Sequence, residues 1–107
     1  MFISPYLNPI CEAIDKQLVV ELRYRDDTQF REFDPYWLYV STTGKTLLGG
    51  WQERNPNKPQ ENNIYHKFDL SLIRELIITG NTFKVQLGIP ITRPKDCINL
   101  IRGLNGF

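Results

Sequence analysis

The feature that most constrains this chain is a series of short strand-like segments that follow one helical segment. Residues 18–25 alternate apolar and polar side chains, which is typical of a strand with one buried face. Asp26-Asp27 predicts a turn after it. Further strands are predicted over residues 28–41, 45–52, 64–68 and 73–79. One helix followed by five short strands at close spacing indicates a small, strongly bent antiparallel sheet.

The helix is predicted over residues 8–17. Asn8 can cap it, Pro9 suits its first turn, and apolar residues recur at three- and four-residue steps from Ile10. Pro35 interrupts the second strand and predicts a bend, a bulge or an edge position. Gly49-Gly50 marks a place where a barrel corner or a bound ligand could come close.

The remaining segments are connections and a tail. Residues 53–63 are polar and contain two prolines, which predicts a mobile loop, and residues 69–71 predict a tight turn or one helical turn. Residues 96–104 have helical spacing and predict a second helix. The tail carries seven large apolar residues: Ile89, Ile91, Ile98, Leu100, Ile101, Leu104 and Phe107.

These segments predict one mainly β (α+β) domain over residues 1–107: a small five-stranded antiparallel β-barrel of the Sm-like or SH3-like type. Its barrel core spans about residues 18–84, with an N-terminal helix before it and a C-terminal extension over 89–107. Closing the sheet hides edges that a flat sheet of this size would expose. The predicted core consists of Leu18, Val20, Leu22, Tyr24, Leu38, Val40, Leu48, Ile73 and Phe83.

Composition removes several classes of protein. The formal net charge of +1 gives no global basic field for nucleic acid, and no apolar run is long enough to span a membrane. His66 is the only histidine, so a structural zinc site with Cys11 and Cys97 is not expected. Without a secretory signal, two free thiols in a reducing, cytoplasmic compartment are the expected state of the cysteines.

The sequence contains few of the residue patterns that catalysis needs, so no catalytic residue, metal or cofactor is expected. A nucleophile would need His66 as its base, and no G-x-S-x-G elbow is present. Turn formation and solvation account for the carboxylate pairs Asp26-Asp27 and Glu32/Asp34. Gly49-Gly50 lacks the residues that follow in a phosphate-binding loop.

Aromatic and basic residues are interleaved along the predicted strands, as in small barrels that stack bases on rings and meet phosphates with cations. Strands favour aromatic residues in any case, and half of these rings must fill the core. The aromatic residues are Tyr24, Tyr36, Trp37, Tyr39, Trp51, Tyr65 and Phe68, and the basic ones are Arg23, Arg25, Arg31, Lys45, Arg54, His66 and Lys67.

The order of these segments resembles a WYL domain over about residues 8–84. Residues 13–24 are similar to its opening helix and a strand that ends in Tyr, and residues 31–38 match an R-x-x-x-P-x-x-L stretch. Residues 68–73 fall on an F-x-L-x-R-I segment, with Leu72 in place of its arginine. Thr46-Leu47-Leu48 stands where the Trp-Tyr-Leu triplet is expected, so the fold transfers better than the ligand contacts.

The resemblance implies an Sm-like barrel in a bacterial transcriptional or defence regulator that senses a nucleotide or single-stranded nucleic acid without catalysis. The winged helix-turn-helix that usually precedes such a domain is not among these residues, so the domain either stands alone or belongs to a larger regulator. For the ligand site we expect Arg31 and Lys67 to meet phosphate, Tyr36 and Trp51 to stack, and His66 to hydrogen-bond.

The alternative is a protein-interaction or dimerisation module that has lost the ligand site. The apolar tail must be buried somewhere, because each exposed large apolar side chain forfeits about 1.5–3 kcal/mol of burial. Residues 89–107 therefore pack either on the chain's own barrel or across a two-fold axis in a homodimer, which is the favoured prediction.

Overall fold

One antiparallel sheet and one helix make up the part of the chain that the structure, a computed structural model, describes: residues 4–86 and 94–104. The elements are α1 (Leu7–Lys16), β1 (Leu18–Tyr24), β2 (Arg31–Ser41), β3 (Thr46–Arg54), β4 (Ile64–Asp69), β5 (Ile73–Thr82) and β6 (Cys97–Gly103). Single 3-10 turns occupy Pro59–Glu61 and Leu70–Leu72. The helix and the five predicted strands are confirmed. Neither this helix nor the 3-10 turns of the described ranges could cross a membrane.

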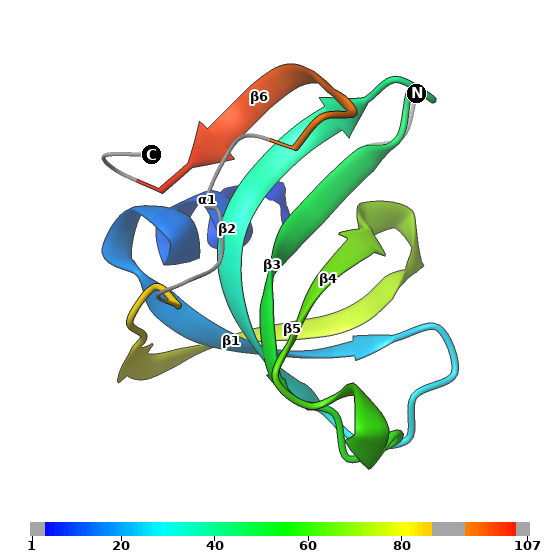
Figure 1. The fold of residues 1–107 in the computed structure, drawn as a ribbon, viewed down its shortest axis with the longest axis vertical. Helices are drawn as coiled ribbons and strands as arrows, with labels where there is room; N and C mark the ends of the chain where they lie inside the picture. The colour runs from blue at the N-terminus through cyan, green and yellow to red at the C-terminus, as the bar shows by residue number, and fades with distance from the viewer. Residues whose placement is uncertain (1–3, 87–93, 105–107) are drawn as a thin grey trace.

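Strand β2 is the centre of the sheet, whose strand order is β4-β3-β2-β1-β5 (Figure 1). Along one side, β2 pairs first with β1, at Arg31–Phe33, and then with β6, at Trp37–Ser41. Pro35 lies between these two pairings, where the register with β3 also shifts. Gly50 of β3 faces this point, and a Cβ there would meet the carbonyl of Asp34. The predicted bend at Pro35 is confirmed, and a neighbouring backbone, not a ligand, approaches Gly50.

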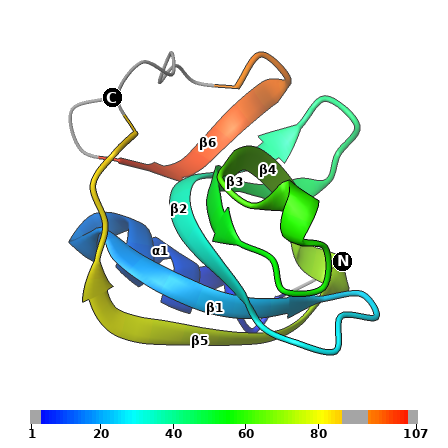
Figure 2. The ribbon, with the colours of Figure 1, turned by 60° about the horizontal axis from the view of Figure 1, so that its bottom comes forward.

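The sheet is strongly curved because its two outer strands are joined directly. The 3-10 turn Leu70–Leu72 alone connects β4 to β5, which stand at opposite ends of the strand order. Asp69 stabilises this turn by accepting a 3.0 Å hydrogen bond from the Ser71 backbone N–H, which agrees with the predicted turn. The result is a bent, unclosed sheet with α1 packed along β1 and β2 (Figure 2).

The core lies between the curved sheet and α1. Of the predicted core residues, six are buried, whereas Leu18, Tyr24 and Val40 are half-buried. The aromatic residues Phe33, Tyr36, Trp37, Tyr39 and Phe68 are also buried. Strand β2 is therefore buried on both faces from Phe33 to Tyr39, in keeping with the continuous apolar run of residues 36–40.

The predicted helix over residues 96–104 is wrong, because Cys97–Gly103 forms strand β6. Once β1 has left β2, the backbone of Trp37–Ser41 needs a new partner, and β6 supplies it. Gly103 lies so close to the ring of Trp37 that a Cβ would stand 2.8 Å from it. The described part of the tail thus packs on its own sheet, and Leu104 is buried there. The predicted contributions of Ile89, Ile91 and Phe107 lie outside the described residues.

Candidate functional site

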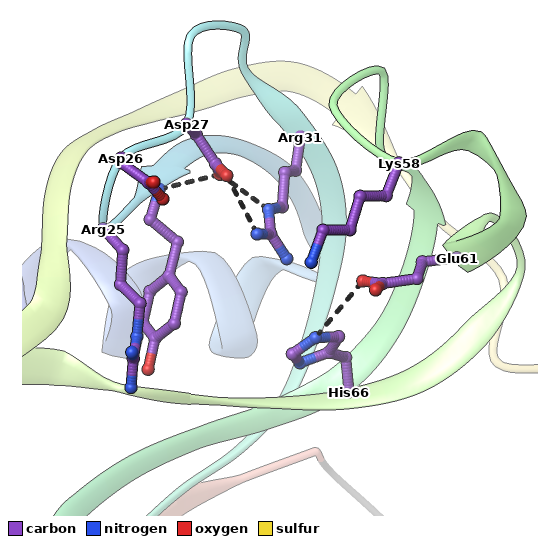
Figure 3. A pocket seen from close by; sticks show the side chains of 8 residues that line it. Arg25, Asp26, Asp27, Arg31, Lys58, Glu61 and His66 are labelled. Atoms are coloured by element: carbon purple, nitrogen blue, oxygen red, sulfur yellow. Dashed lines mark hydrogen bonds and ion pairs between the residues drawn. The ribbon is translucent and has the colours of Figure 1, made fainter.

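A pocket of about 290 Å³ opens between two loops at one end of the sheet (Figure 3). One wall comes from the turn between β1 and β2, and the other from the connection between β3 and β4. The lining residues are Tyr24, Arg25, Asp26, Asp27, Arg31, Lys58, Glu61 and His66. Its volume suits a small ligand or one unit of a polymer, and its lining is mostly charged.

A buried ion pair fixes one side of the pocket. The Arg31 side chain is 9% exposed, and its Nε and Nη2 donate to the Asp27 carboxylate at 2.7 and 3.0 Å. Nη1 donates to Gln52 at 3.2 Å, and the Tyr24 backbone N–H donates to Asp27 at 3.0 Å. Arg31 carries five N–H groups, so this network leaves two for other partners.

Asp27 is held in its charged form. Burial by itself would raise the pKa of this carboxyl. The hydrogen bonds from Arg31 and the Tyr24 backbone, with the positive charges of Arg31 and Lys58, outweigh burial and lower the pKa. Asp27 therefore neutralises Arg31 at neutral pH. Its hydrogen bonds with the Tyr24 backbone confirm the predicted role in turn formation, whereas solvation is the wrong explanation for this buried carboxylate.

An aromatic layer forms the floor beside this pair. His66 and Phe68 alternate along β4, so their side chains share one face, and their rings stack at 4.6 Å with 9° between planes. The Arg31 guanidinium lies 5.4 Å from the centre of the Phe68 ring, and Tyr24 packs edge-on against the same ring at 4.9 Å. The layer holds the His66 ring in one orientation.

The hydrogen bonds of His66 define which nitrogen carries its proton. Nδ1 lies 2.9 Å from the Lys67 backbone carbonyl, which can only accept, so Nδ1 is the protonated nitrogen. Burial lowers the pKa of His66, with help from the Arg31 charge, and outweighs the Lys67 hydrogen bond and the Glu61 and Asp27 charges. Neutral His66 therefore presents Nε2 as a hydrogen-bond acceptor, 3.9 Å from Glu61 Oε1.

The connection between β3 and β4 is built by asparagines and not by apolar residues. Asn55 is buried, and its backbone N–H donates to Asn62 at 2.7 Å. Asn57 accepts from the backbone N–H of Gln29 at 3.0 Å and donates to its carbonyl at 3.0 Å, which ties the two pocket walls together. The segment predicted as a mobile loop has a defined, hydrogen-bonded conformation.

Two cations at the pocket have no ion-pair partner among the described residues. Lys58 is exposed on the second wall. Arg25 extends from the turn after β1, with its guanidinium 5.7 Å from the centre of the Tyr24 ring. Arg31 is neutralised by Asp27, so Lys58 and Arg25 are the lining cations that remain free to meet an anion.

The structure splits the five site residues predicted from sequence. Arg31 and His66 both line the pocket. Lys67 follows His66 along β4, so its side chain points to the opposite face of the sheet. Trp51 is on that opposite face too, directly across from Tyr65, and Lys67 pairs there with Asp96 at 3.7 Å.

Tyr36 belongs to the core. Its ring is 1% exposed and stacks on Phe83 at a centroid distance of 5.8 Å. Its hydroxyl accepts a 3.1 Å hydrogen bond from the Gln86 backbone N–H. The geometry therefore brings two of the five predicted residues together, places two on the outer face, and buries one.

Lys58 and Glu61 are site residues that the sequence reasoning missed. Both lie in the polar segment 53–63, where no periodicity relates a side chain to a face of the sheet. The available signal is Pro59, which favours the first position of a helical turn and so places Lys58 and Glu61 one turn apart. Asp27 and Arg31 give a second signal. Their opposite charges, four residues apart around a turn, indicate an ion pair at this end of the sheet.

A second polar feature lies on β2. Asp34 is 1% exposed, and its Oδ1 has no hydrogen-bond partner in the structure. Burial, followed by a hydrogen bond to Glu53 and the charges of Glu53 and Glu32, raises the pKa of Asp34 to about 9. Solvation was the predicted explanation for this carboxylate, and it is wrong.

Comparison of the chain with protein-family models, with curated proteins and with solved structures finds no match in any of the three. Across residues 4–86 and 94–104, no three His, Cys, Asp or Glu side chains gather as a metal site would require. The geometry of the pocket is therefore the basis for any functional assignment.

Proposed function

We propose that this protein is a non-enzymatic ligand-sensing domain that binds a nucleotide or single-stranded nucleic acid in the pocket between its two loops. The observation that carries the proposal is the presence of two free cations, Lys58 and Arg25, in one pocket with the rings of Tyr24 and His66, which the buried Phe68 holds in place. Phosphates are met by cations, and aromatic groups contact bases or sugars, in proteins that bind single strands.

The WYL-like assignment, with its Sm-like barrel and its place in bacterial transcriptional or defence regulation, is part of this proposal. The order of a helix followed by a curved meander of β1 to β4 supports it. So does the return of β5 to pair with β1, which brings the ends of a five-stranded sheet toward closure. Phe68, the first residue of the F-x-L segment, is fully buried and packs edge-on against Phe33.

The lining of the pocket favours binding over catalysis. His66 is the one group there that could act as a base near neutral pH, and no serine, threonine or cysteine lines the pocket with it. Its ring is held by Phe68 and by the Lys67 carbonyl, so it is suited to a fixed hydrogen bond.

The test is the salt dependence of binding to a short single-stranded oligonucleotide. Each phosphate neutralised by the protein contributes about −0.7 to the slope of log affinity against log salt. Lys58→Ala should flatten the slope by about that amount, because it removes one free cation from the pocket. Lys67→Ala is the matched control on the opposite face, and Lys84→Ala is an exposed control outside the sheet.

The two lysines distinguish the two faces. If Lys67→Ala flattens the slope and Lys58→Ala does not, the ligand lies on the outer face with Trp51 and Tyr65, and the pocket assignment fails. If no binding is detected at low salt and high protein concentration, the nucleic-acid proposal fails as a whole.

A protein-interaction or homodimerisation module is the second candidate, and β6 favours it. This strand pairs with β2 on one side only, among the described residues, and its Ile98 is 68% exposed. An unpaired edge with an exposed apolar side chain can accept a further strand. Sedimentation of the full chain tests the predicted dimer through residues 89–107, and a monomer over a wide concentration range would exclude it.

A further inference from the structure

Two hydrogen-bond acceptors lie side by side in the pocket, on the wall opposite the turn between β1 and β2. Neutral His66 presents Nε2, and Glu61 presents a carboxylate whose Oε1 lies 3.9 Å from it. This distance is too long for a direct hydrogen bond. Two acceptors that face the same space cannot satisfy each other, so both are available to a donor on a ligand.

The acceptors are held in place independently of any ligand. The stack on Phe68 and the Lys67 carbonyl fix His66. Gln52 donates to the Glu61 backbone carbonyl at 2.8 Å, and Asn55 Nδ2 contacts the Glu61 carboxylate at 3.4 Å. A preorganised acceptor pair gives up little conformational freedom when it binds, so its hydrogen bonds can contribute to selectivity.

The free cation Lys58 has a fixed relation to these acceptors. Lys58 caps the 3-10 turn that ends at Glu61, and the Glu61 backbone N–H donates to the Lys58 carbonyl at 2.9 Å. The side chains of Lys58, Glu61 and His66 all line the pocket (Figure 3). A ligand there is therefore met by a cation and by two acceptors, as the phosphate and the 2′-hydroxyl of one nucleotide would require.

We propose that the pocket selects ribonucleotides over deoxyribonucleotides, with the ribose 2′-hydroxyl donating a shared, three-centre hydrogen bond to the Glu61 carboxylate and to Nε2 of His66, which lie 3.9 Å apart. The inference rests on the proposed function and names the ligand class within it. The 2′-hydroxyl is the donor that RNA has and DNA lacks, so acceptors placed beside a phosphate-binding cation read that difference directly. A carboxylate that accepts from a ribose hydroxyl is the recognition used in dinucleotide-binding folds.

The first experiment compares affinities of the unmodified protein for short oligo(rU) and oligo(dU), which share a base and differ only at the 2′ position. We expect oligo(rU) to bind on the order of tenfold more tightly, because a hydrogen bond to a charged acceptor is lost in oligo(dU). Equal affinities would overturn the ribose inference and leave the proposed function standing. No binding of either oligonucleotide would overturn both.

The second experiment assigns the preference to these two residues. Glu61→Gln keeps the shape of the side chain but removes its charge, and His66→Phe keeps an aromatic ring on Phe68 but removes Nε2. Each should lower the affinity for oligo(rU) several-fold toward that for oligo(dU), which should itself change little. Glu12→Gln, an exposed carboxylate on α1, is the control and should retain the full preference. A ribose preference that survives both pocket variants would overturn the assignment, because the 2′-hydroxyl would then be read elsewhere.

Discussion

The buried carboxyl of Asp34 predicts an unusual dependence of stability on pH. Its pKa is raised to about 9 by burial and by its neighbours Glu53 and Glu32. The folded protein therefore holds a proton at this site across the neutral range. In the unfolded chain the carboxyl has its ordinary pKa near 3.8 and has released that proton.

The sign and size of the effect follow from proton linkage. Below about pH 4 both states bind the proton and Asp34 has no effect on the pH dependence. Above that, the folded state binds one proton more than the unfolded state, so the free energy of unfolding falls by about 1.4 kcal/mol per pH unit, up to about pH 9. From about pH 5 to pH 8 the expected loss is on the order of 4 kcal/mol for the one proton held by Asp34.

Asp34→Asn isolates this effect, because an amide has the shape of the protonated carboxyl and can donate to Glu53 as it does. Urea unfolding of both proteins across this pH range should show similar stability near pH 5 and a more stable variant near pH 8, by up to the about 4 kcal/mol above. Asp26→Asn, in the exposed turn, is the control and should follow the unmodified protein. A difference between variant and parent that stays constant with pH would refute the reasoning.

Three further predictions concern the core, the tail and the pocket. Leu22→Ala, at a fully buried position of β1, should lower the free energy of unfolding by about 2–5 kcal/mol in denaturant melts, and a change below about 0.5 kcal/mol would contradict its burial. A chain that ends at Gly88 should melt at a lower temperature, because Trp37 and the second half of β2 lose β6; an unchanged melting temperature would show that β6 contributes nothing in cis. The pKa of His66 is lowered, and its charged neighbours are Arg31, Glu61 and Asp27. Acidification through this pKa should reduce the ratio of oligo(rU) affinity to oligo(dU) affinity, because protonated Nε2 donates a hydrogen bond and no longer accepts one. A ratio that is the same at neutral and at acid pH would contradict this role.

The fold was largely predictable because local pattern and tertiary environment agree in most segments. In strand β1 the core residues Val20 and Leu22 alternate with the partly exposed Glu21 and Arg23, so the alternation is visible in the sequence. The prediction for the tail was wrong because the spacing of Cys97, Ile98 and Ile101 suits a helix. The backbone of β2 beyond Pro35 instead pairs with this segment as a strand. A sequence cannot show which backbone lacks a partner until the sheet has been assembled.

The site was less predictable because the sequence relates aromatic and basic residues by their closeness along the chain, and closeness along the chain does not place side chains on one surface. Neighbours on a strand point to opposite faces, so His66 and Lys67 could never share one surface. Tyr36 sits at the bulge beside Pro35, where the alternation breaks, and its burial depends on Phe83. Lys58 and Glu61 are placed by a hydrogen-bonded loop, for which apolar periodicity gives no information.

Strands and loops contribute different properties to the pocket. Arg31, His66 and Phe68 stand on β2 and β4, where the sheet and the core fix their positions, and changes there affect folding as well as binding. Lys58 and Glu61 stand at the two ends of a 3-10 turn whose shape depends mainly on backbone and asparagine hydrogen bonds, to which the Glu61 side chain adds one 3.4 Å contact with Asn55. Substitutions at these two positions can therefore change the charge and the hydrogen-bonding capacity of the pocket while the sheet stays intact. For this reason the variants at Lys58 and Glu61 report on the ligand, whereas a variant at Arg31 would report mainly on the loss of partner for a buried Asp27.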